Sequence, residues 1–268
     1  MISTQICHDT CTGIDAYEFS GTDKEFSPHF HPYYVIGLMI CGERRLMHRG
    51  HEYALKSGDV MLLEPGDIHS CICTGSTGSR PMSYMALNIS PERTPCFPAG
   101  LIRFSEPITN SRAIYNAAGQ LCRAVIQNTA AVHKRELLSG LTEALLSEYG
   151  RGDTDGTRTY DTAAEAACRY IEAHFSENIS LKQICGAVFM SRASLIREFA
   201  AVKGISPCRY LKNIRLCNAQ RLLEKGYSPA DAAAASGFAD QSHFTHSFKA
   251  HTGFTPSVYR RIFNERQD

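Results

Sequence analysis

Three histidines in the first part of this 268-residue chain have the residue type and spacing of a metal or ligand site. His29 and His31 stand two positions apart, so on a strand both side chains point to the same face. His69 stands at the edge of a later predicted strand and is expected to converge on them. Three imidazoles with an open position suit a zinc-like or iron-like divalent ion. They can equally bind a polar ligand directly or satisfy backbone groups, and these three alternatives stay open.

Polar side chains near these histidines would orient a small molecule in a mostly apolar pocket. The candidates are Tyr33, Tyr34, Arg44, Arg45 and Glu64. Isolated Arg and Glu side chains on strands are usually solvated, which argues against most of this set. Tyr34 and Glu64 are carried forward as ligand-binding residues, together with His29, His31 and His69.

A second set of candidates lies near the C-terminus, where a pattern of residue types occurs twice, 49 positions apart. The pairs are Phe189 with Phe238, Ser191 with Asp240, Phe199 with Phe248, Gly204 with Gly253, Pro207 with Pro256 and Tyr210 with Tyr259. The first copy predicts helices over 181–188 and 192–202, and the second over 229–236 and 241–251, with Ser191 and Asp240 as caps. Each copy therefore predicts a helix-turn-helix, whose second helix enters the major groove of DNA.

Helical spacing divides the second helix of each copy into a buried face and a free face. Leu195 with Phe199, and Phe244 with Phe248, are four residues apart and form the buried stripes. The free faces are expected to contact bases through Ala193, Ile196, Arg197, Gln241, Ser242, His243, Thr245 and His246.

Arg197 is the strongest of these candidates, because an arginine can form a bidentate bond to guanine, and Gln241 can pair with adenine. The residues expected to hold phosphates are Arg192, Lys203, Arg215 and Lys249. Two helix pairs that only contact protein are the plainer alternative. Residues 161–268 hold 14 Lys and Arg against 10 Asp and Glu, a modest excess that favours a polyanionic partner.

This C-terminal segment resembles the AraC family of transcription regulators. The residues that carry the resemblance are Ser191 with Leu195 and Phe199, Gly204-Ile205-Ser206-Pro207, Arg215-Leu216 with Ala219 and Leu222-Leu223, Gly237-Phe238 with Ser242-His243-Phe244, Phe248-Lys249, and Gly253-Phe254-Thr255-Pro256 with Tyr259-Arg260. It departs from the family at Cys185-Gly186, where a Leu-Ala-type pair is usual. The resemblance implies double-stranded DNA and a small-molecule effector as partners, with RNA polymerase as a further candidate.

Short strand-like runs separated by turns fill residues 15–89 and predict a sandwich or barrel. This region resembles the cupin-like sensor domain of many AraC-type regulators, through His29-Phe30-His31, Gly58-Asp59, and Pro65-Gly66 followed by His69. Metal-binding cupins place a Glu shortly after the His pair, but residues 33–38 contain no carboxylate. The resemblance implies a non-enzymatic regulator with no catalytic residues; the alternative is a metal-dependent cupin enzyme with an appended DNA-binding tail.

The expected fold class is therefore two domains: an all-β cupin-like barrel with trailing helices, then an all-α domain with two helix-turn-helix motifs joined by a long helix. The sensor domain is expected over 1–150, a linker over 151–160 and the DNA-binding domain over 161–268. The trailing helices, 110–127 and 134–149, carry apolar stripes that pack on the barrel or form the interface of a homodimer.

Composition fits these expectations. Hydrophobic residues make up 43% and charged residues 21% of the chain, as in ordinary globular proteins. No run of 18 apolar residues and no N-terminal leader pattern is present, so a cytoplasmic protein without membrane contact is expected. The 11 cysteines lack zinc-finger spacing and are expected to be free thiols.

Overall fold

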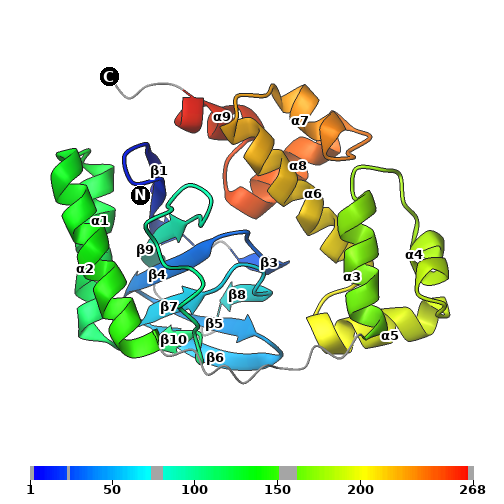
Figure 1. Cartoon of the computed structure of the whole chain (residues 1–268), viewed down its shortest axis with the longest axis horizontal. Coiled ribbons are helices and arrows are strands. Elements are labelled where there is room, and N and C mark those ends of the chain that lie inside the picture. Colours follow the sequence, from blue (N-terminus) through cyan, green and yellow to red (C-terminus); the bar gives the residue numbers. More distant parts are fainter. Residues whose placement is uncertain (1–2, 23–24, 74–80, 151–161, 265–268) are drawn as a thin grey trace. The chain divides into compact units, whose positions relative to one another are not determined.

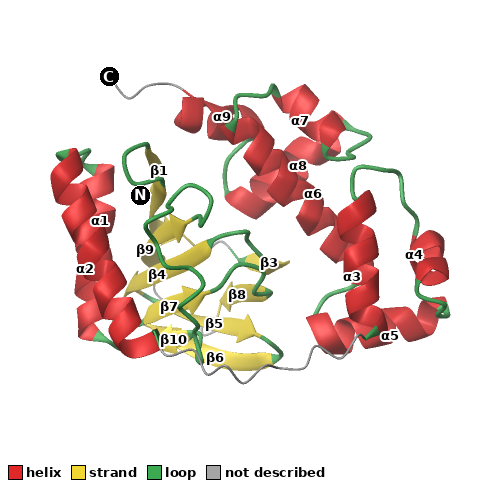
Figure 2. Ribbon diagram, viewed as in Figure 1, coloured by secondary structure: helices red, strands yellow, loops and turns green. Residues whose placement is uncertain are grey.

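The structure of the chain is a computed structural model that describes residues 3–22, 25–73, 81–150 and 162–264 (Figures 1 and 2). The chain divides into two units, Met1–Asp155 and Gly156–Asp268. The first unit holds the strands and two helices, and the second is helical, which confirms the predicted fold class. The predicted linker, 151–160, lies outside the described residues. Among the helices of the described ranges, none is long and apolar enough to span a membrane.

The strands of the first unit form two antiparallel sheets. In chain order they are β1 (Ser3–Asp9), β2 (Ile14–Thr22), β3 (Phe26–His29), β4 (Tyr34–Cys41), β5 (Glu43–His48), β6 (His51–Lys56), β7 (Val60–Leu63), β8 (His69–Cys73), β9 (Met82–Ile89) and β10 (Ile108–Thr109). The order in the larger sheet is β1-β2-β9-β4-β7-β10, and in the smaller sheet β3-β8-β5-β6. The smaller sheet brings β3 and β8 together, and with them His29 and His69.

Two helices, α1 (Arg112–Ile126) and α2 (Ala131–Tyr149), pack with the larger sheet in one hydrophobic core (Figure 1). Leu138, Leu141 and Leu145 of α2 are buried in this core with Ile36 of β4 and Leu121 of α1. The apolar stripe predicted over 134–149 therefore stabilises the fold of its own unit.

The second unit consists of paired helices around a central one. They are α3 (Ala163–His174), α4 (Leu181–Ala187), α5 (Arg192–Lys203), α6 (Pro207–Glu224), α7 (Pro229–Ala235), α8 (Gln241–Thr252) and α9 (Pro256–Asn264). The pairs α4–α5 and α7–α8 are the two predicted helix-turn-helix motifs, and α6 contacts members of both.

The ends of α5 and α8 are fixed by the predicted capping residues. The Ser194 amide donates to Ser191 Oγ at 3.2 Å, and the Ser242 amide donates to Asp240 Oδ1 at 2.9 Å. Each helix stops at a glycine with left-handed backbone, Gly204 at the end of α5 and Gly253 at the end of α8. At these four positions the 49-residue repeat holds.

The turn between the paired helices is one residue shorter in the first motif. The α4 cap, Val188, and the α7 cap, Ser236, are 48 residues apart, whereas Ser191 and Asp240 are 49 apart. The residue equivalent to Phe238 is therefore Met190.

The predicted pairing of Phe189 with Phe238 is wrong for this reason. Phe189 takes the place of Gly237, and the φ angles of the two residues are 55° and 78°. Phe238 is buried, but the side chain of Phe189 is 97% exposed. An aromatic residue thus occupies a left-handed position that glycine adopts without strain.

Gly237 lies where three parts of the second unit meet. A Cβ at this position would be 2.7 Å from the Phe175 carbonyl oxygen, 2.9 Å from that of Ser176 and 3.0 Å from Nε of Arg215. Arg215, on α6, donates through Nε to the Phe175 carbonyl at 2.7 Å and through a terminal nitrogen to the Glu177 carbonyl at 2.7 Å. The central helix, the α3–α4 loop and the second turn are joined at this point.

Gly237→Ala is expected to destabilise the second unit by at least about 2 kcal/mol, because left-handed backbone costs other residues about 1–2 kcal/mol and the methyl group meets two carbonyls. Gly186→Ala in α4 is the control: no heavy atom lies within 4 Å of its Cβ position, so alanine should stabilise by about 0.5–1 kcal/mol. Urea denaturation of the full chain, with amide hydrogen exchange of α6 as local readout, measures both. Similar effects of the two substitutions would contradict this account.

Candidate ligand site and nucleic-acid interface

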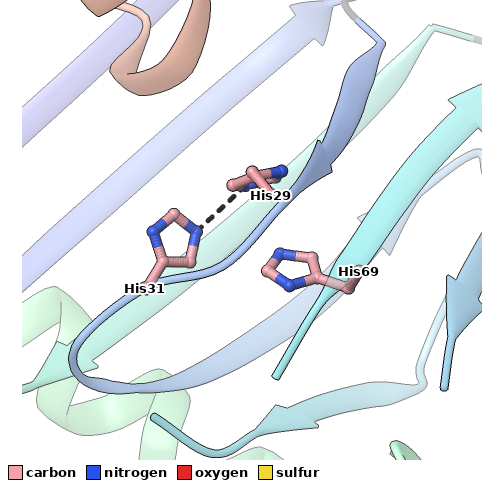
Figure 3. A group of neighbouring side chains, drawn as sticks. All are labelled: His29, His31 and His69. Carbon is pink, nitrogen blue, oxygen red and sulfur yellow. Dashed lines mark hydrogen bonds between the residues drawn. The ribbon is translucent and has the colours of Figure 1, made fainter. Parts of the chain in front are cut away.

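The three predicted histidines converge in the first unit (Figure 3). His29 ends β3 and is paired in register with His69, the first residue of β8. His31 lies in the loop after β3, and not on the strand as predicted, yet its ring centroid is 4.7 Å from that of His29 and 5.3 Å from that of His69. One nitrogen of each ring lies within 4.8 Å of the others.

Backbone carbonyls fix the orientation of two of the rings. His29 Nδ1 lies 2.7 Å from the Ser27 carbonyl oxygen, and His69 Nδ1 lies 2.9 Å from that of Asp67. Because a carbonyl only accepts, each Nδ1 carries the hydrogen and each Nε2 keeps a lone pair. Burial lowers the pKa of His69 to about 4, so this ring is neutral near pH 7.

The donor set fits a divalent transition-metal ion. His29 Nε2 and His31 Nε2 are 3.1 Å apart. Two nitrogens bound to one tetrahedral ion at about 2.0–2.1 Å would be about 3.3 Å apart. Within the described residues no carboxylate joins the three rings as a fourth ligand, which leaves a position open to another molecule.

Tyr34 and Glu64, predicted to bind ligand, are engaged with the segment 99–104. The Tyr34 hydroxyl is buried in the helix-covered core and donates to the Ala99 carbonyl at 2.5 Å. The Glu64 carboxylate accepts from the Phe104 amide at 2.8 Å and from Arg103 at 3.2 Å. Burial, with a smaller contribution from Glu64, raises the pKa of Tyr34. Both contacts anchor this segment on the sheet; the predicted role of Tyr34 and Glu64 in ligand binding stays a prediction.

Two residues of this unit, Tyr33 and Arg44, were not carried forward as site residues from the sequence, but both are buried. Tyr33 is buried, and its ring stacks on His31 with centroids 4.9 Å apart and planes 11° apart. Arg44 on β5 is 1% exposed, so the expectation that it is solvated is wrong. Tyr33 stands two positions after His31, and this spacing could have identified it as a neighbour of the cluster. The sequence does not mark the carbonyls of Ser27 and Asp67, because every residue carries a backbone carbonyl.

The residues predicted to contact bases lie on one side of α5 and α8. Of these predicted residues, the exposed ones are Ala193, Ile196, Arg197, Gln241, Ser242, His243 and His246, and Thr245 is partly exposed. Leu195, Phe199, Phe244 and Phe248 are fully buried, as predicted. Both helices therefore expose one face to solvent and bury the opposite apolar stripe; the exposed face is polar on α8, whereas on α5 Arg197 lies between Ala193 and Ile196.

The predicted phosphate contacts fall into two groups. Arg192 and Lys249 are exposed, and Lys203 is partly exposed at the end of α5. The guanidinium of Arg215 is half-buried against the Phe175 and Glu177 carbonyls, and burial lowers its pKa. The structure thus favours a structural role for Arg215.

Two family models match the chain. The model of the AraC-like ligand binding domain matches residues 12–146, and that of a helix-turn-helix domain matches residues 184–262. The first match contains the histidine cluster, and the second contains the exposed faces of α5 and α8.

Relatives with the same organisation are transcription regulators. YbfI of Bacillus subtilis, an uncharacterized HTH-type transcriptional regulator, is 32% identical over 237 residues, which cover 86% of this chain and 85% of YbfI. The arabinose operon regulatory protein of Escherichia coli is 24% identical, over 87% of this chain and 82% of that protein. The crystal structure of ToxT from Vibrio cholerae matches with a TM-score of 0.54 at 19% identity, over 98% of this chain and 99% of ToxT, so the fold is shared.

Arg215→Gln is expected to destabilise the second unit by about 1.5–3 kcal/mol, because it removes charged hydrogen bonds to two carbonyls. The slope of log Kobs for DNA against log salt should not change. Arg192→Gln, at an exposed position, should leave stability unchanged and reduce that slope by about one. Denaturation and salt titration of both variants test this. A smaller salt slope with intact stability in Arg215→Gln would show that Arg215 holds a phosphate after all.

Proposed function

The chain belongs to the AraC family of transcription regulators, and we propose that it reads DNA with α5 and α8 and receives its small-molecule signal at the histidine cluster. That it is a sequence-specific DNA-binding regulator responding to a small molecule follows from the two family models and the relatives. The observation that carries the DNA part of the proposal is the pair of exposed faces on α5 and α8. Each exposed face belongs to a helix with a capped N-terminus and lies opposite a buried apolar stripe.

The central helix α6 sets the separation of these two faces. With 18 residues it is about 27 Å long, which is the same order as the ~34 Å between successive major-groove segments on one side of the duplex. Arg197 then contacts guanine and Gln241 contacts adenine, while Ala193 and Ile196 contact thymine methyl groups. Ser242, His243, Thr245 and His246 supply further base contacts. Phosphate contacts come from Arg192, Lys203 and Lys249.

At the histidine cluster, His29, His31 and His69 hold a divalent transition-metal ion. When bound, such an ion supplies a Lewis-acidic position for a polar group of the effector. The ring of Tyr33 forms a wall beside His31. The effector regulates DNA binding only to the extent that its affinity differs between two arrangements of the chain.

The regulator acts as a homodimer. Two copies in a homodimer present two DNA-binding units to adjacent half-sites, and RNA polymerase is the partner through which transcription changes. The protein acts in the cytoplasm. A metal-dependent enzyme is the alternative that the histidines suggest, but relatives covering more than four-fifths of the chain are regulators.

Selection of binding sites from random duplexes by the full chain, at two salt concentrations, tests the two-helix model. A consensus with two separated submotifs is expected, and Arg197→Ala should relax one submotif only, with a loss of about 1–3 kcal/mol. Arg112→Ala, on α1 of the first unit, is the control and should leave the consensus intact. Binding without a consensus, or equal loss at both submotifs, contradicts the model.

Cobalt titration followed by visible absorption tests the metal proposal. One ion per chain is expected, with a spectrum of nitrogen ligation that His29→Ala and His69→Ala each abolish. His133→Ala removes an exposed histidine from α2 and should retain the ion. The proposal fails if the full chain holds no stoichiometric metal, or if the control loses as much as the cluster variants.

A further inference from the structure

A cavity of about 380 Å³ lies between α1 and the larger sheet of the first unit. Its walls come from β2, β9, the end of β4 and the C-terminal half of α1; these three strands are neighbours in the larger sheet. The histidine cluster belongs to the smaller sheet and contributes no residue to it. The volume is within the range of small-molecule sites, about 300–1,000 Å³.

Opposite charges face this cavity from its two walls. Glu18 on β2 is in register with Met85 on β9, which is buried in the core under α1, so Glu18 projects from the helix-covered face of the sheet. Arg123 projects from α1. Within the described residues, neither side chain forms a hydrogen bond or ion pair with the other or with a third group.

The two charged groups also act on one neighbouring thiol. Burial, with a smaller contribution from Glu18 and an opposing one from Arg123, raises the pKa of the Cys122 thiol to about 12. Both charged groups are therefore within electrostatic reach of Cys122.

The guanidinium of Arg123 lies back along α1 beside Gly119. A Cβ at Gly119 would be 3.4 Å from a terminal nitrogen of Arg123, one turn later in the helix, and 3.4 Å from Cδ1 of Leu38. This places the guanidinium next to the helix surface that lines the cavity.

We propose that this cavity binds a small zwitterion with an apolar body, of the chemical class of an apolar amino acid. Its ammonium group pairs with Glu18, its carboxylate pairs with Arg123, and its apolar body packs on Met85 and Ile126. A molecule with only one charge would leave one of these two ion pairs unformed and would therefore bind more weakly. The site is independent of the histidine cluster and adds a second effector class to the proposed function.

Calorimetry on the full chain with L-phenylalanine, L-leucine and L-methionine tests the proposal. At least one of these should bind with a stoichiometry of one. For a ligand such as L-phenylalanine, the methyl ester lacks the carboxylate and the N-acetyl derivative lacks the ammonium group. Each single-charge analogue of the ligand that binds should be weaker by about tenfold or more.

Isosteric variants locate the binding. Glu18→Gln and Arg123→Gln should each weaken the zwitterion by about tenfold or more, while Arg112→Gln on α1 and Glu136→Gln on α2 remove exposed charges elsewhere and should not. His29→Ala should leave this binding intact, so that failure here and failure of the histidine site are distinguishable. The proposal is overturned if no zwitterion binds, if the analogues bind equally well, or if the Glu18 and Arg123 variants match their controls.

Discussion

The contact of Arg215 with the backbone around Gly237 determines how the second unit can work. One guanidinium on α6 binds the carbonyls of the α3–α4 loop, and the glycine of the second turn packs against the same backbone. The second helix-turn-helix motif is thereby packed, at the middle of α6, against the loop that leads into the first. The proposed reading of two DNA segments requires a fixed separation between α5 and α8, and we infer that this contact contributes to it.

Much of this unit could be predicted from the sequence, because helix caps and buried stripes are local signals. Ser191, Asp240 and the phenylalanine stripes are where periodicity and capping rules place them. The turns within the two motifs were harder to predict. The first turn is one residue shorter than the second, which shifts the alignment of the two copies by one position, and only the hydrogen bonds of the turn show that Phe189 corresponds to Gly237. The role of Arg215 depends on carbonyls 38 and 40 residues away, for which the sequence carries no mark.

In the first unit, residue type predicted the histidine cluster better than strand assignment did. The histidines converge even though His31 has left the strand, because the loop after β3 stays beside β8. The burial of Tyr34 under the helices could not be predicted, because alternation cannot tell the helix-covered face of a sheet from the other face. The burial of Arg44 could have been predicted. Arg44 stands two positions before the buried Leu46, and the two-residue period of a strand places both side chains on one face.

The central claim is that α6 holds two reading helices at one fixed separation. Its most direct test is the affinity of the full chain for its selected duplex after insertion of one or two base pairs between the submotifs. Each inserted base pair rotates the second submotif by about 35° and moves it along the axis, beyond the reach of a rigid pair. If α6 holds the two helices rigidly, the affinity for the duplex should fall by at least about tenfold, or ~1.4 kcal/mol. Unchanged affinity would show that the two motifs move independently and would contradict a fixed separation.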